Sequence, residues 1–210
     1  MNQLTAGIII IGNEILSGRT KDTNSNFISK ELIKIGIKLS EIRIIPDESE
    51  IIIKTVINFH KRFTYVFTTG GIGPTHDDIT SESIAKAFKK KYIIDPRVLK
   101  ILIEYYSKGD LNSGRKKMAK IPADSELILN PLTAAPGFKI NNVFVLPGVP
   151  MIMKKMFRSL IKNISIGKPK KISTINTNLF ESIVASKLSN IQKKYNDCEI
   201  GSYPYFNFTK

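Results

Sequence analysis

The chain of 210 residues has one cysteine, Cys198, and two histidines. A single cysteine excludes a disulfide within the chain and offers no cysteine cluster for a metal. No run of about 18 apolar residues occurs, so the sequence predicts no transmembrane helix and no membrane partner. The first residues, Met1-Asn2-Gln3-Leu4-Thr5, lack the positive charge with which a secretory signal begins. We therefore expect a cytoplasmic protein.

Acidic residues are few relative to basic ones: 18 Asp and Glu stand against 32 Lys and Arg, for a net charge of +14. Such a charge is typical of nucleic-acid binding. The basic residues are nevertheless scattered along the chain, and no aromatic RNA-binding motif or helix-turn-helix pattern accompanies them. A solvated, lysine-rich surface is the favoured interpretation, and a non-catalytic nucleic-acid-binding module stays an alternative.

Apolar segments of strand length alternate with helix-like segments in the first 165 residues. Strands are expected over residues 6–11, 37–45, 64–69, 126–129 and 143–146, and helices over residues 22–35, 48–60, 81–90, 96–107 and 150–161. Residues 109–114 and the segment joining the last two strands are expected as loops, and residues 115–120 as a helical turn. This alternation predicts an α/β fold with a mostly parallel sheet.

A basic segment rich in Gly and Pro, residues 163–171, is typical of a linker. We place a main domain over residues 1–165 and a small α+β extension over residues 166–210, with a strand at 172–175, a helix at 179–195 and a strand at 199–203. The extension is too short to bury much core alone, so we expect it to pack on the main domain or on a partner chain. Whether further residues follow Lys210 is left open.

Three glycines lie between the strand that ends at Thr69 and the following helix. The run Thr69-Gly70-Gly71-Ile72-Gly73-Pro74-Thr75-His76-Asp77-Asp78-Ile79-Thr80 lets the backbone approach a ligand and precedes a helix N-terminus, which favours anions. Carboxylates beside a phosphate would repel it. The combination therefore predicts a phosphorylated ligand held together with a divalent metal ion such as Mg²⁺.

Three other distinctive segments also follow strands, and in a parallel sheet the ends of such strands gather at one edge. They are Gly12-Asn13-Glu14-Ile15-Leu16-Ser17-Gly18-Arg19, Pro46-Asp47-Glu48 and Leu146-Pro147-Gly148-Val149-Pro150. If the segments converge, Glu14 and Asp78 are candidate metal ligands. Asp47 and Asp78 are candidate catalytic residues for transfer or hydrolysis at a phosphoanhydride. The residues expected to bind the phosphorylated ligand are Thr69, Gly70, Gly71, Gly73, Thr80, Pro147 and Gly148.

Each of these side chains also has a structural explanation. Asp47 could end a strand in a turn, Asp78 or Thr80 could cap the helix after the glycines, and Glu14 could be a solvated turn residue. We favour function for Asp78 and Glu14 and leave Asp47 evenly balanced. Asp77 and His60 are interpreted as structural, and His76 as a minor ligand contact. No Ser-His-Asp or Cys-His spacing occurs, so covalent catalysis is not expected.

Taken together, the four segments resemble the MoaB/Mog domain family, over residues 5–165. The Glu14-Ile15-Leu16 and Gly73-Pro74-Thr75-His76-Asp77-Asp78-Ile79-Thr80 versions are similar to the CinA branch. The segments Arg115 to Pro122, Ala134 to Phe138 and Glu199 to Phe206 look closest to short bacterial relatives and to the N-terminal domain of eukaryotic FAD synthase.

The resemblance implies a three-layer α/β/α fold and, as for most members, self-association. It implies adenylylation of molybdopterin for the molybdenum-cofactor enzymes, and metal-dependent cleavage of ADP-ribose-like pyrophosphates or of FAD for the CinA and FAD-synthase branches. Asp47 and Asp78 match the aspartates implicated in the molybdopterin enzymes, and Glu14 falls in the CinA signature. These 210 residues do not include the amidase domain of full CinA proteins, so deamidation of nicotinamide nucleotides is not expected of them, and residues 133–137 lack the serine-rich pterin-binding version of the loop.

The sequence-based hypothesis is therefore a metal-dependent nucleotide pyrophosphatase acting on a dinucleotide such as ADP-ribose or FAD. A molybdopterin-binding or adenylylating protein is the alternative. The partner expected in either case is a small-molecule nucleotide or pterin, and the chain is expected to form a homo-oligomer. The preferred substrate, the metal and the oligomeric state are left open.

Overall fold

The computed structural model describes residues 3–107, 110–169 and 171–204. The chain forms two compact units, residues 1–170 and residues 171–210, and each is described by itself. Among the described residues, no helix combines the length and apolar character needed to cross a membrane.

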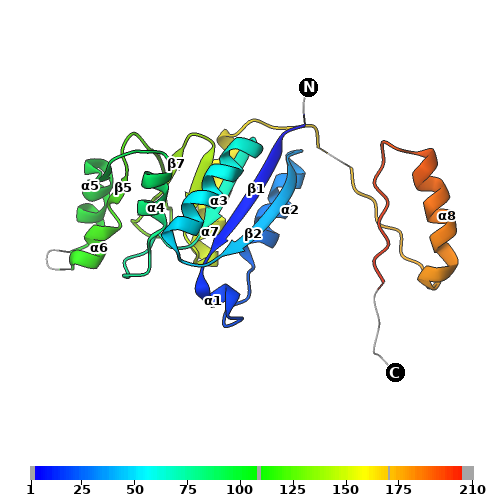
Figure 1. Cartoon of the computed structure of the whole chain (residues 1–210), viewed down its shortest axis with the longest axis horizontal. Coiled ribbons are helices and arrows are strands. Elements are labelled where there is room, and N and C mark those ends of the chain that lie inside the picture. The colour runs from blue at the N-terminus through cyan, green and yellow to red at the C-terminus, as the bar shows by residue number, and fades with distance from the viewer. Residues whose placement is uncertain (1–2, 108–109, 170, 205–210) are drawn as a thin grey trace. The chain divides into compact units, whose positions relative to one another are not determined.

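A six-stranded sheet runs through the first unit in the order β2-β1-β3-β8-β7-β6 (Figure 1). Its strands are β1 (Thr5–Ile11), β2 (Lys38–Ile45), β3 (Tyr65–Thr69), β6 (Glu126–Ile128), β7 (Gly137–Ile140) and β8 (Val143–Leu146). β1 pairs in parallel with β2 and with β3, and β3 pairs in parallel with β8. β7 and β6 extend the sheet in antiparallel register. The expected α/β fold with a mostly parallel sheet is confirmed.

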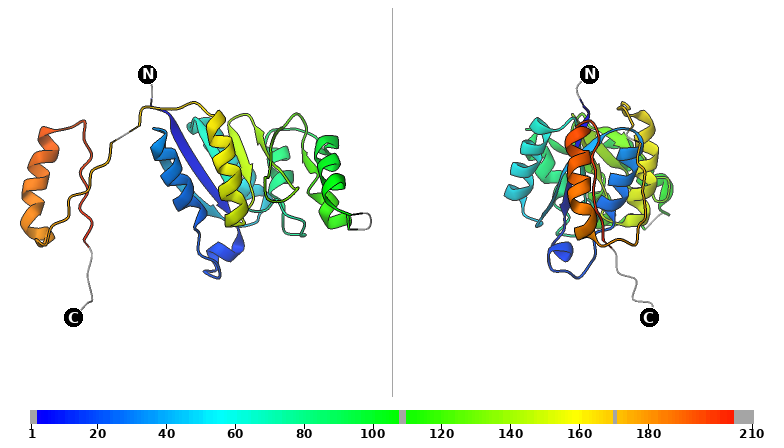
Figure 2. Two further views of the ribbon diagram at one scale, coloured as in Figure 1. Left: turned by 180° about the vertical axis from the view of Figure 1, so that it is seen from behind. Right: turned by 90° about the vertical axis from the view of Figure 1, so that its right-hand side faces the viewer.

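Helices cover both faces of the sheet, which gives three layers (Figure 2, right). Alternate residues of β1 point to opposite faces, as strand geometry requires. Ile8 and Ile10 pack in a core with α2 (Asn24–Lys34) and α7 (Pro150–Leu160). Ile9 and Ile11 pack in a second core with α3 (Ser49–Arg62) and α4 (Thr80–Ala87). Burial of β1 on both faces explains why its sequence is a continuous apolar run.

Three short strands lie where the sequence analysis expected none. β4 (Tyr92–Ile94) and β5 (Lys120–Pro122) form a separate antiparallel pair beside α5 (Pro96–Tyr105) and α6 (Ser113–Lys117). The third, β7, lies in the segment expected as a loop. Each of these strands has only three or four residues, too few to show an alternating pattern. β7 begins at Gly137, where an added Cβ would lie 2.2 Å from the Val145 carbonyl oxygen.

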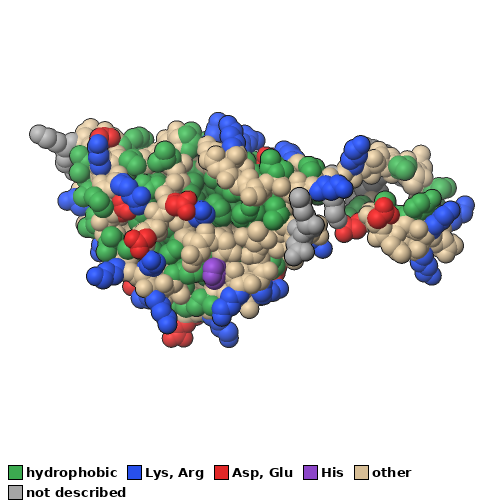
Figure 3. Space-filling model, turned by 90° about the horizontal axis from the view of Figure 1, so that it is seen from above, with side chains coloured by type: hydrophobic (Ala, Val, Ile, Leu, Met, Phe, Trp, Pro, Cys, Tyr) green, Lys and Arg blue, Asp and Glu red, His purple; other side chains and the backbone are tan. Residues whose placement is uncertain are grey.

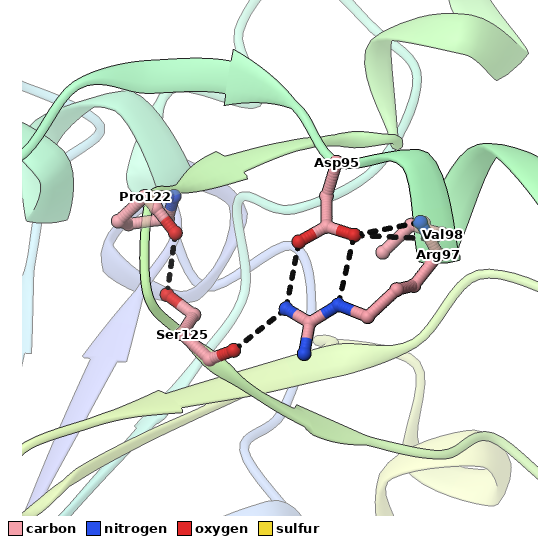
Figure 4. Close-up of polar contacts among 5 residues, drawn as sticks. All are labelled: Asp95, Arg97, Val98, Pro122 and Ser125. Atoms are coloured by element: carbon pink, nitrogen blue, oxygen red, sulfur yellow. Dashed lines mark hydrogen bonds and ion pairs between the residues drawn. The ribbon is translucent and has the colours of Figure 1, made fainter.

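A polar network, in which Asp95 and Ser125 are buried and Arg97 is exposed, holds the start of α5 against the segment before β6 (Figure 4). The Asp95 carboxylate accepts hydrogen bonds from the backbone N–H of Arg97 (2.8 Å) and from the Arg97 guanidinium (3.1 and 2.7 Å). Arg97 also donates to the Ser125 carbonyl (2.8 Å), and the Ser125 hydroxyl donates to the Pro122 carbonyl (2.7 Å). The pKa of Asp95 lies below its usual value, chiefly because the Arg97 side chain hydrogen-bonds to the carboxylate.

Lys and Arg side chains are dispersed over the face seen in Figure 3 rather than collected into one patch. Several are engaged within the first unit. Arg43 and Arg62 lie over the rings of Phe59 and Phe63, for example, and both contact Glu41. Part of the basic excess therefore supports local packing.

The linker begins by packing on the first unit. After α7 and the short helix η1 (Ile161–Asn163), the Gly167 N–H donates to the Ile35 carbonyl at 2.8 Å. Gly36 has a φ of +73° there, and an added Cβ would lie 2.4 Å from the Lys168 carbonyl carbon. Only glycine fits this close approach without displacing the linker.

The second unit contains α8 (Glu181–Lys194), which confirms the helix expected at 179–195. The strands expected at 172–175 and 199–203 are wrong: neither segment pairs with a strand among the described residues. Ile172 and Ile175 are 68% and 89% exposed, so no buried face supports a strand there. The Gln192 side chain instead binds the second segment, accepting from the Ile200 N–H (2.9 Å) and donating to the Cys198 carbonyl (2.7 Å).

The Asp95 network predicts a measurable loss of stability in the variant Asp95→Ala. This change removes a helix cap and a charged hydrogen bond, so we expect the free energy of unfolding to fall by about 2 kcal/mol at neutral pH. A lowered pKa stabilises the fold above the ordinary Asp pKa, 3.8, and that contribution is lost as the pH falls through the folded-state pKa. Denaturant unfolding at pH 7 and at about pH 3 measures both effects.

Asp124→Asn is the control, because Asp124 makes only an exposed ion pair with Lys90 and asparagine tolerates its φ of +64°. We expect it to change stability by less than about 0.5 kcal/mol. Equal losses in the two variants would contradict a special role for Asp95.

Candidate functional site

The four segments that follow β1, β2, β3 and β8 meet at the carboxyl edge of the parallel strands. The Gly12 N–H donates to the Ile45 carbonyl (3.2 Å), which joins the ends of β1 and β2. The Gly70 N–H donates to the Leu146 carbonyl (3.1 Å), which joins the ends of β3 and β8. In Figure 1 the helix α1 (Asn13–Leu16) marks this edge, beyond the end of β1. We call it the loop edge.

One hydrogen bond connects the Glu14 and Asp47 segments directly. The Asn13 N–H, at the first position of α1, donates to Asp47 Oδ2 at 2.9 Å. The Glu14 carboxylate folds back over the preceding backbone, because an added Cβ on Gly12 would lie 2.6 Å from both of its oxygens. Gly12 thus leaves the space that the Glu14 side chain uses.

Asp47 lies among negative charges. Its pKa is raised above the usual value, first by burial and then by the charges of Glu14, Asp77 and Asp78, while the hydrogen bond from Asn13 opposes the shift. The three charges come from two different segments, so the folded chain brings the predicted catalytic and metal-binding carboxylates to one place. A carboxylate with a raised pKa accepts a proton more readily, which is the property of a general base.

The glycines after β3 make room for other atoms of the protein. Gly70 has a φ of +104°, and an added Cβ would lie 2.0 Å from the Ile11 carbonyl oxygen. Gly71 has a φ of +68°, and its added Cβ would lie 2.1 Å from Thr80 Oγ1. The Thr80 N–H donates to the Gly71 carbonyl at 2.9 Å, so helix α4 begins directly against this glycine. The first two glycines are required by the close packing of β1 and α4.

The third glycine, Gly73, accommodates Asp78, whose Oδ2 would lie 2.7 Å from an added Cβ. The same Oδ2 accepts hydrogen bonds from the Thr75 N–H (2.8 Å) and the Thr75 hydroxyl. Helix α4 has no side-chain cap, so neither Asp78 nor Thr80 has the capping role considered from the sequence. Asp78 instead closes the turn that follows Gly73.

Several buried oxygens at or near the loop edge have no hydrogen-bond partner among the described residues. They are Thr69 Oγ1 at the end of β3, its neighbour Thr68 Oγ1, Thr80 Oγ1 at the start of α4, and Asn24 Oδ1. The Asn24 amide nitrogen donates to the Gly148 carbonyl at 2.7 Å, which ties α2 to the segment after β8. Leaving such groups unsatisfied costs about 1–3 kcal/mol each. Thr69 and Thr80 are themselves predicted ligand-binding residues, and Asn24 contacts a third, Gly148.

The two histidines differ in environment. His76 is exposed on the turn after Gly73. His60 contacts Asn142 through Nδ1 and packs edge-on against Phe88, so it is engaged in structure as the sequence suggested. Sequence reasoning missed Asn13 and Asn24, whose hydrogen bonds join distant segments that no local pattern reveals. It also missed Thr75, which binds the nearby Asp78 within the same turn.

Among the described residues, no group of three or more His, Cys, Asp or Glu side chains is arranged to hold a metal ion. Mg²⁺ is commonly bound by only one or two carboxylates together with substrate phosphates and water. The oxygens of Glu14 and Asp78 are the donor type that Mg²⁺ prefers, so the residues fit a metal that arrives with a phosphorylated ligand. They do not form a complete site by themselves.

Two hollows are found away from the loop edge. One of about 370 Å³ lies between α5 and residues 130–134, and one of about 280 Å³ lies within the second unit, between α8 and Ser202. Neither contains a residue of the four loop-edge segments. The loop edge is therefore distinguished by its chemistry rather than by either of these cavities.

Comparison with known proteins identifies the family. The sequence model of the family described as a probable molybdopterin binding domain matches residues 7–165. The sequence model of the FAD synthase middle domain matches residues 171–210. This chain belongs to the MoaB/Mog domain family. The first match contains all four loop-edge segments.

The similarity to several relatives extends over nearly the whole length of this chain. A protein of Archaeoglobus fulgidus is 38% identical over 94% of this chain and 84% of its own length. A CinA-like protein of Thermosipho melanesiensis is 33% identical over 93% of this chain, and a probable FAD synthase of Caenorhabditis elegans is 33% identical over 95%. The chain spans 50% and 44% of the length of these last two proteins.

Solved structures agree with the fold. The protein CinA with unknown function from Thermoplasma acidophilum is 35% identical, with a TM-score of 0.71 over 77% of this chain and 99% of its own. The molybdopterin biosynthesis enzyme MoaB from Thermus thermophilus has a TM-score of 0.50 at 16% identity, over 76% of this chain and 90% of its own, which shows the shared fold alone.

The charges around Asp47 predict that Asp47→Asn stabilises the ligand-free protein. A raised pKa means that the ionised carboxylate destabilises the fold at neutral pH and that protonation relieves this as the pH falls through the folded-state pKa. An asparagine oxygen still accepts from the Asn13 N–H but carries no charge. We expect a gain below about 1 kcal/mol at pH 7, since the site is partly exposed, and a smaller gain at acidic pH. Thermal unfolding measures it.

Glu48→Gln removes the same charge from an exposed neighbour that makes no capping hydrogen bond. We expect this control to leave the melting temperature nearly unchanged. A less stable Asp47→Asn protein would show that its carboxylate stabilises the loop edge.

Proposed function

We propose that the chain is a metal-dependent nucleotide pyrophosphatase acting on dinucleotides such as ADP-ribose or FAD. The observation that carries the proposal is the position of Asp47, held by the Asn13 N–H and surrounded by the charges of Glu14, Asp77 and Asp78. Neutral ligands would gain nothing from such a cluster. The divalent cation that accompanies a pyrophosphate would offset the negative charge of the cluster and of the phosphates together.

The environment of each residue suggests a different role in the reaction. Asp47, with its raised pKa, would accept the proton of the attacking water. Asp78, fixed by Thr75, and Glu14, folded over Gly12, would bind the cation, which supplies charge neutralisation at the phosphates. Helix α4 has no side-chain cap, but its Thr80 N–H is taken by the Gly71 carbonyl, so a phosphate would meet the later N–H groups of the first turn.

The reaction breaks one bridging P–O bond of the pyrophosphate and adds water across it. The products are AMP and a second phosphomonoester, so atoms and charge balance without a further reactant. The carboxylates would position water and cation on one side of the bond. This is chemistry by placement and electrostatics, as in other phosphoryl transfers.

Purified protein with Mg²⁺ or Mn²⁺ is expected to release AMP from at least one ADP-containing dinucleotide in a panel, measured by chromatography of the products. Asp78→Ala is expected to reduce turnover by about 100-fold or more. Asp124→Asn serves as the control, because Asp124 is exposed and lies outside the four loop-edge segments; activity close to that of the wild type is expected. No turnover across the panel with any divalent metal would end the proposal.

A second candidate function is molybdopterin binding, with or without adenylylation, which the match of residues 7–165 to a probable molybdopterin binding domain supports. It requires saturable binding of molybdopterin to the purified chain, measured by fluorescence titration. Saturation together with an absence of dinucleotide turnover would favour this candidate, and no saturation would remove it.

A further inference from the structure

Residues 74–78 form the turn that carries Asp78. Helix α6, which lies outside the four loop-edge segments, contacts this turn. Lys117, in the last turn of α6, donates through Nζ to the Thr75 carbonyl. Gly114 of the same helix lies against Pro74, since an added Cβ would be 3.2 Å from the Pro74 carbonyl oxygen. α6 thus contacts two consecutive residues of the turn, although it is some forty residues away in the sequence.

Thr75 is the centre of this turn. Its N–H and hydroxyl bind the Asp78 carboxylate, its hydroxyl also binds Asp77, and its carbonyl accepts from the Asp78 N–H at 3.3 Å. Residues 74–77 are all exposed, so packing alone does not hold them. The lysine is the side chain from another part of the fold that fixes the Thr75 peptide group.

The lysine is itself well supported. Asn112 caps α6 by accepting from the Arg115 N–H at 2.9 Å, and the Arg115 guanidinium lies 4.2 Å from the centre of the Tyr106 ring. Lys117 is partly buried, whereas its neighbour Lys116 is exposed. These contacts fix helix α6, and with it the backbone from which the Lys117 side chain extends to the turn.

Charge adds a second reason for a cation at this point. The Thr75 hydroxyl contacts the carboxylates of both Asp77 and Asp78, so this turn gathers two negative charges. The neighbouring charges that raise the pKa of Asp47 are also negative. Lys117 brings positive charge to an otherwise acidic group of side chains, and it does so without occupying the carboxylates.

We propose that Lys117 is a positioning residue of this site: by holding the Thr75 carbonyl, it fixes the turn that orients the Asp78 carboxylate. Its effect on catalysis depends on the function proposed above, whereas its hold on the turn does not. The lysine acts through Thr75 and makes no contact with substrate. Its loss therefore lowers the rate of the chemical step and leaves substrate binding nearly unchanged.

Hydrogen–deuterium exchange of the ligand-free protein tests the hold on the turn without any turnover. In Lys117→Met, a peptide covering residues 72–80 is expected to exchange faster than in the wild type, while a peptide covering β1 exchanges as before and reports that the fold is intact. Lys116→Met removes the same charge from the same helix and is expected to change neither peptide. Unchanged exchange in Lys117→Met would overturn the proposal.

Steady-state kinetics on the same variants tests the consequence. We expect kcat of Lys117→Met to fall by about 10-fold or more, with KM and the Kd of ADP within about 2-fold of the wild type. Lys117→Arg, which keeps a donor and the charge, is expected to recover part of kcat, and Lys116→Met to retain all of it. A raised Kd for ADP with unchanged kcat would assign Lys117 to ligand binding and overturn its positioning role. Absence of turnover in every protein, wild type included, would reject the pyrophosphatase and leave the exchange result standing.

Discussion

The close approach of Gly70 to the Ile11 carbonyl determines how the loop edge is assembled. Any side chain at residue 70 would lie within 2.0 Å of that oxygen, and the φ of +104° is one that other residues rarely adopt. Because Gly70 also donates to the Leu146 carbonyl, the ends of β1, β3 and β8 meet within one short stretch of backbone. The positions of Glu14, Asp78 and Gly148 all depend on this contact.

The glycines and carboxylates of the loop edge act as pairs. Gly12 leaves space for Glu14, and Gly73 leaves space for Asp78, so each carboxylate lies close to the backbone of its own segment. This arrangement restricts the side chains and also collects negative charge around Asp47. The cost in stability is small beside the two cores on either face of β1, where a fully buried Ile or Phe side chain contributes about 1.5–3 kcal/mol. A rigid sheet therefore carries an edge whose negative charges repel one another.

Much of this arrangement could be predicted from sequence, because the relevant signals are local. The apolar run Ile8 to Ile11 indicates a strand buried on both faces, and the convergence of the loops follows from parallel pairing. The purpose of each glycine could not be predicted, since Gly71 and Gly73 accommodate Thr80 and Asp78 rather than leaving open backbone. The errors follow from strand pairing: Gly137 begins a strand because its neighbour Phe138 pairs with Val145, whereas Ile172 and Ile175 have no partner strand among the described residues. Strand partners and glycine contacts depend on residues that are distant in the sequence, so the periodicity of a local segment does not predict them.

The close contact between Gly36 and the linker has a consequence for the evolution of the chain. Gly36 lies just before β2 begins, at the amino ends of the parallel strands, so the polypeptide leaves the first unit at the edge opposite Asp47 and Asp78. Sequence appended after residue 168 can change in length or identity without rebuilding the loops. Two of the relatives are about twice as long as this chain. The first unit is in this sense a transferable module, whose chemistry and attachment point are subject to separate selection.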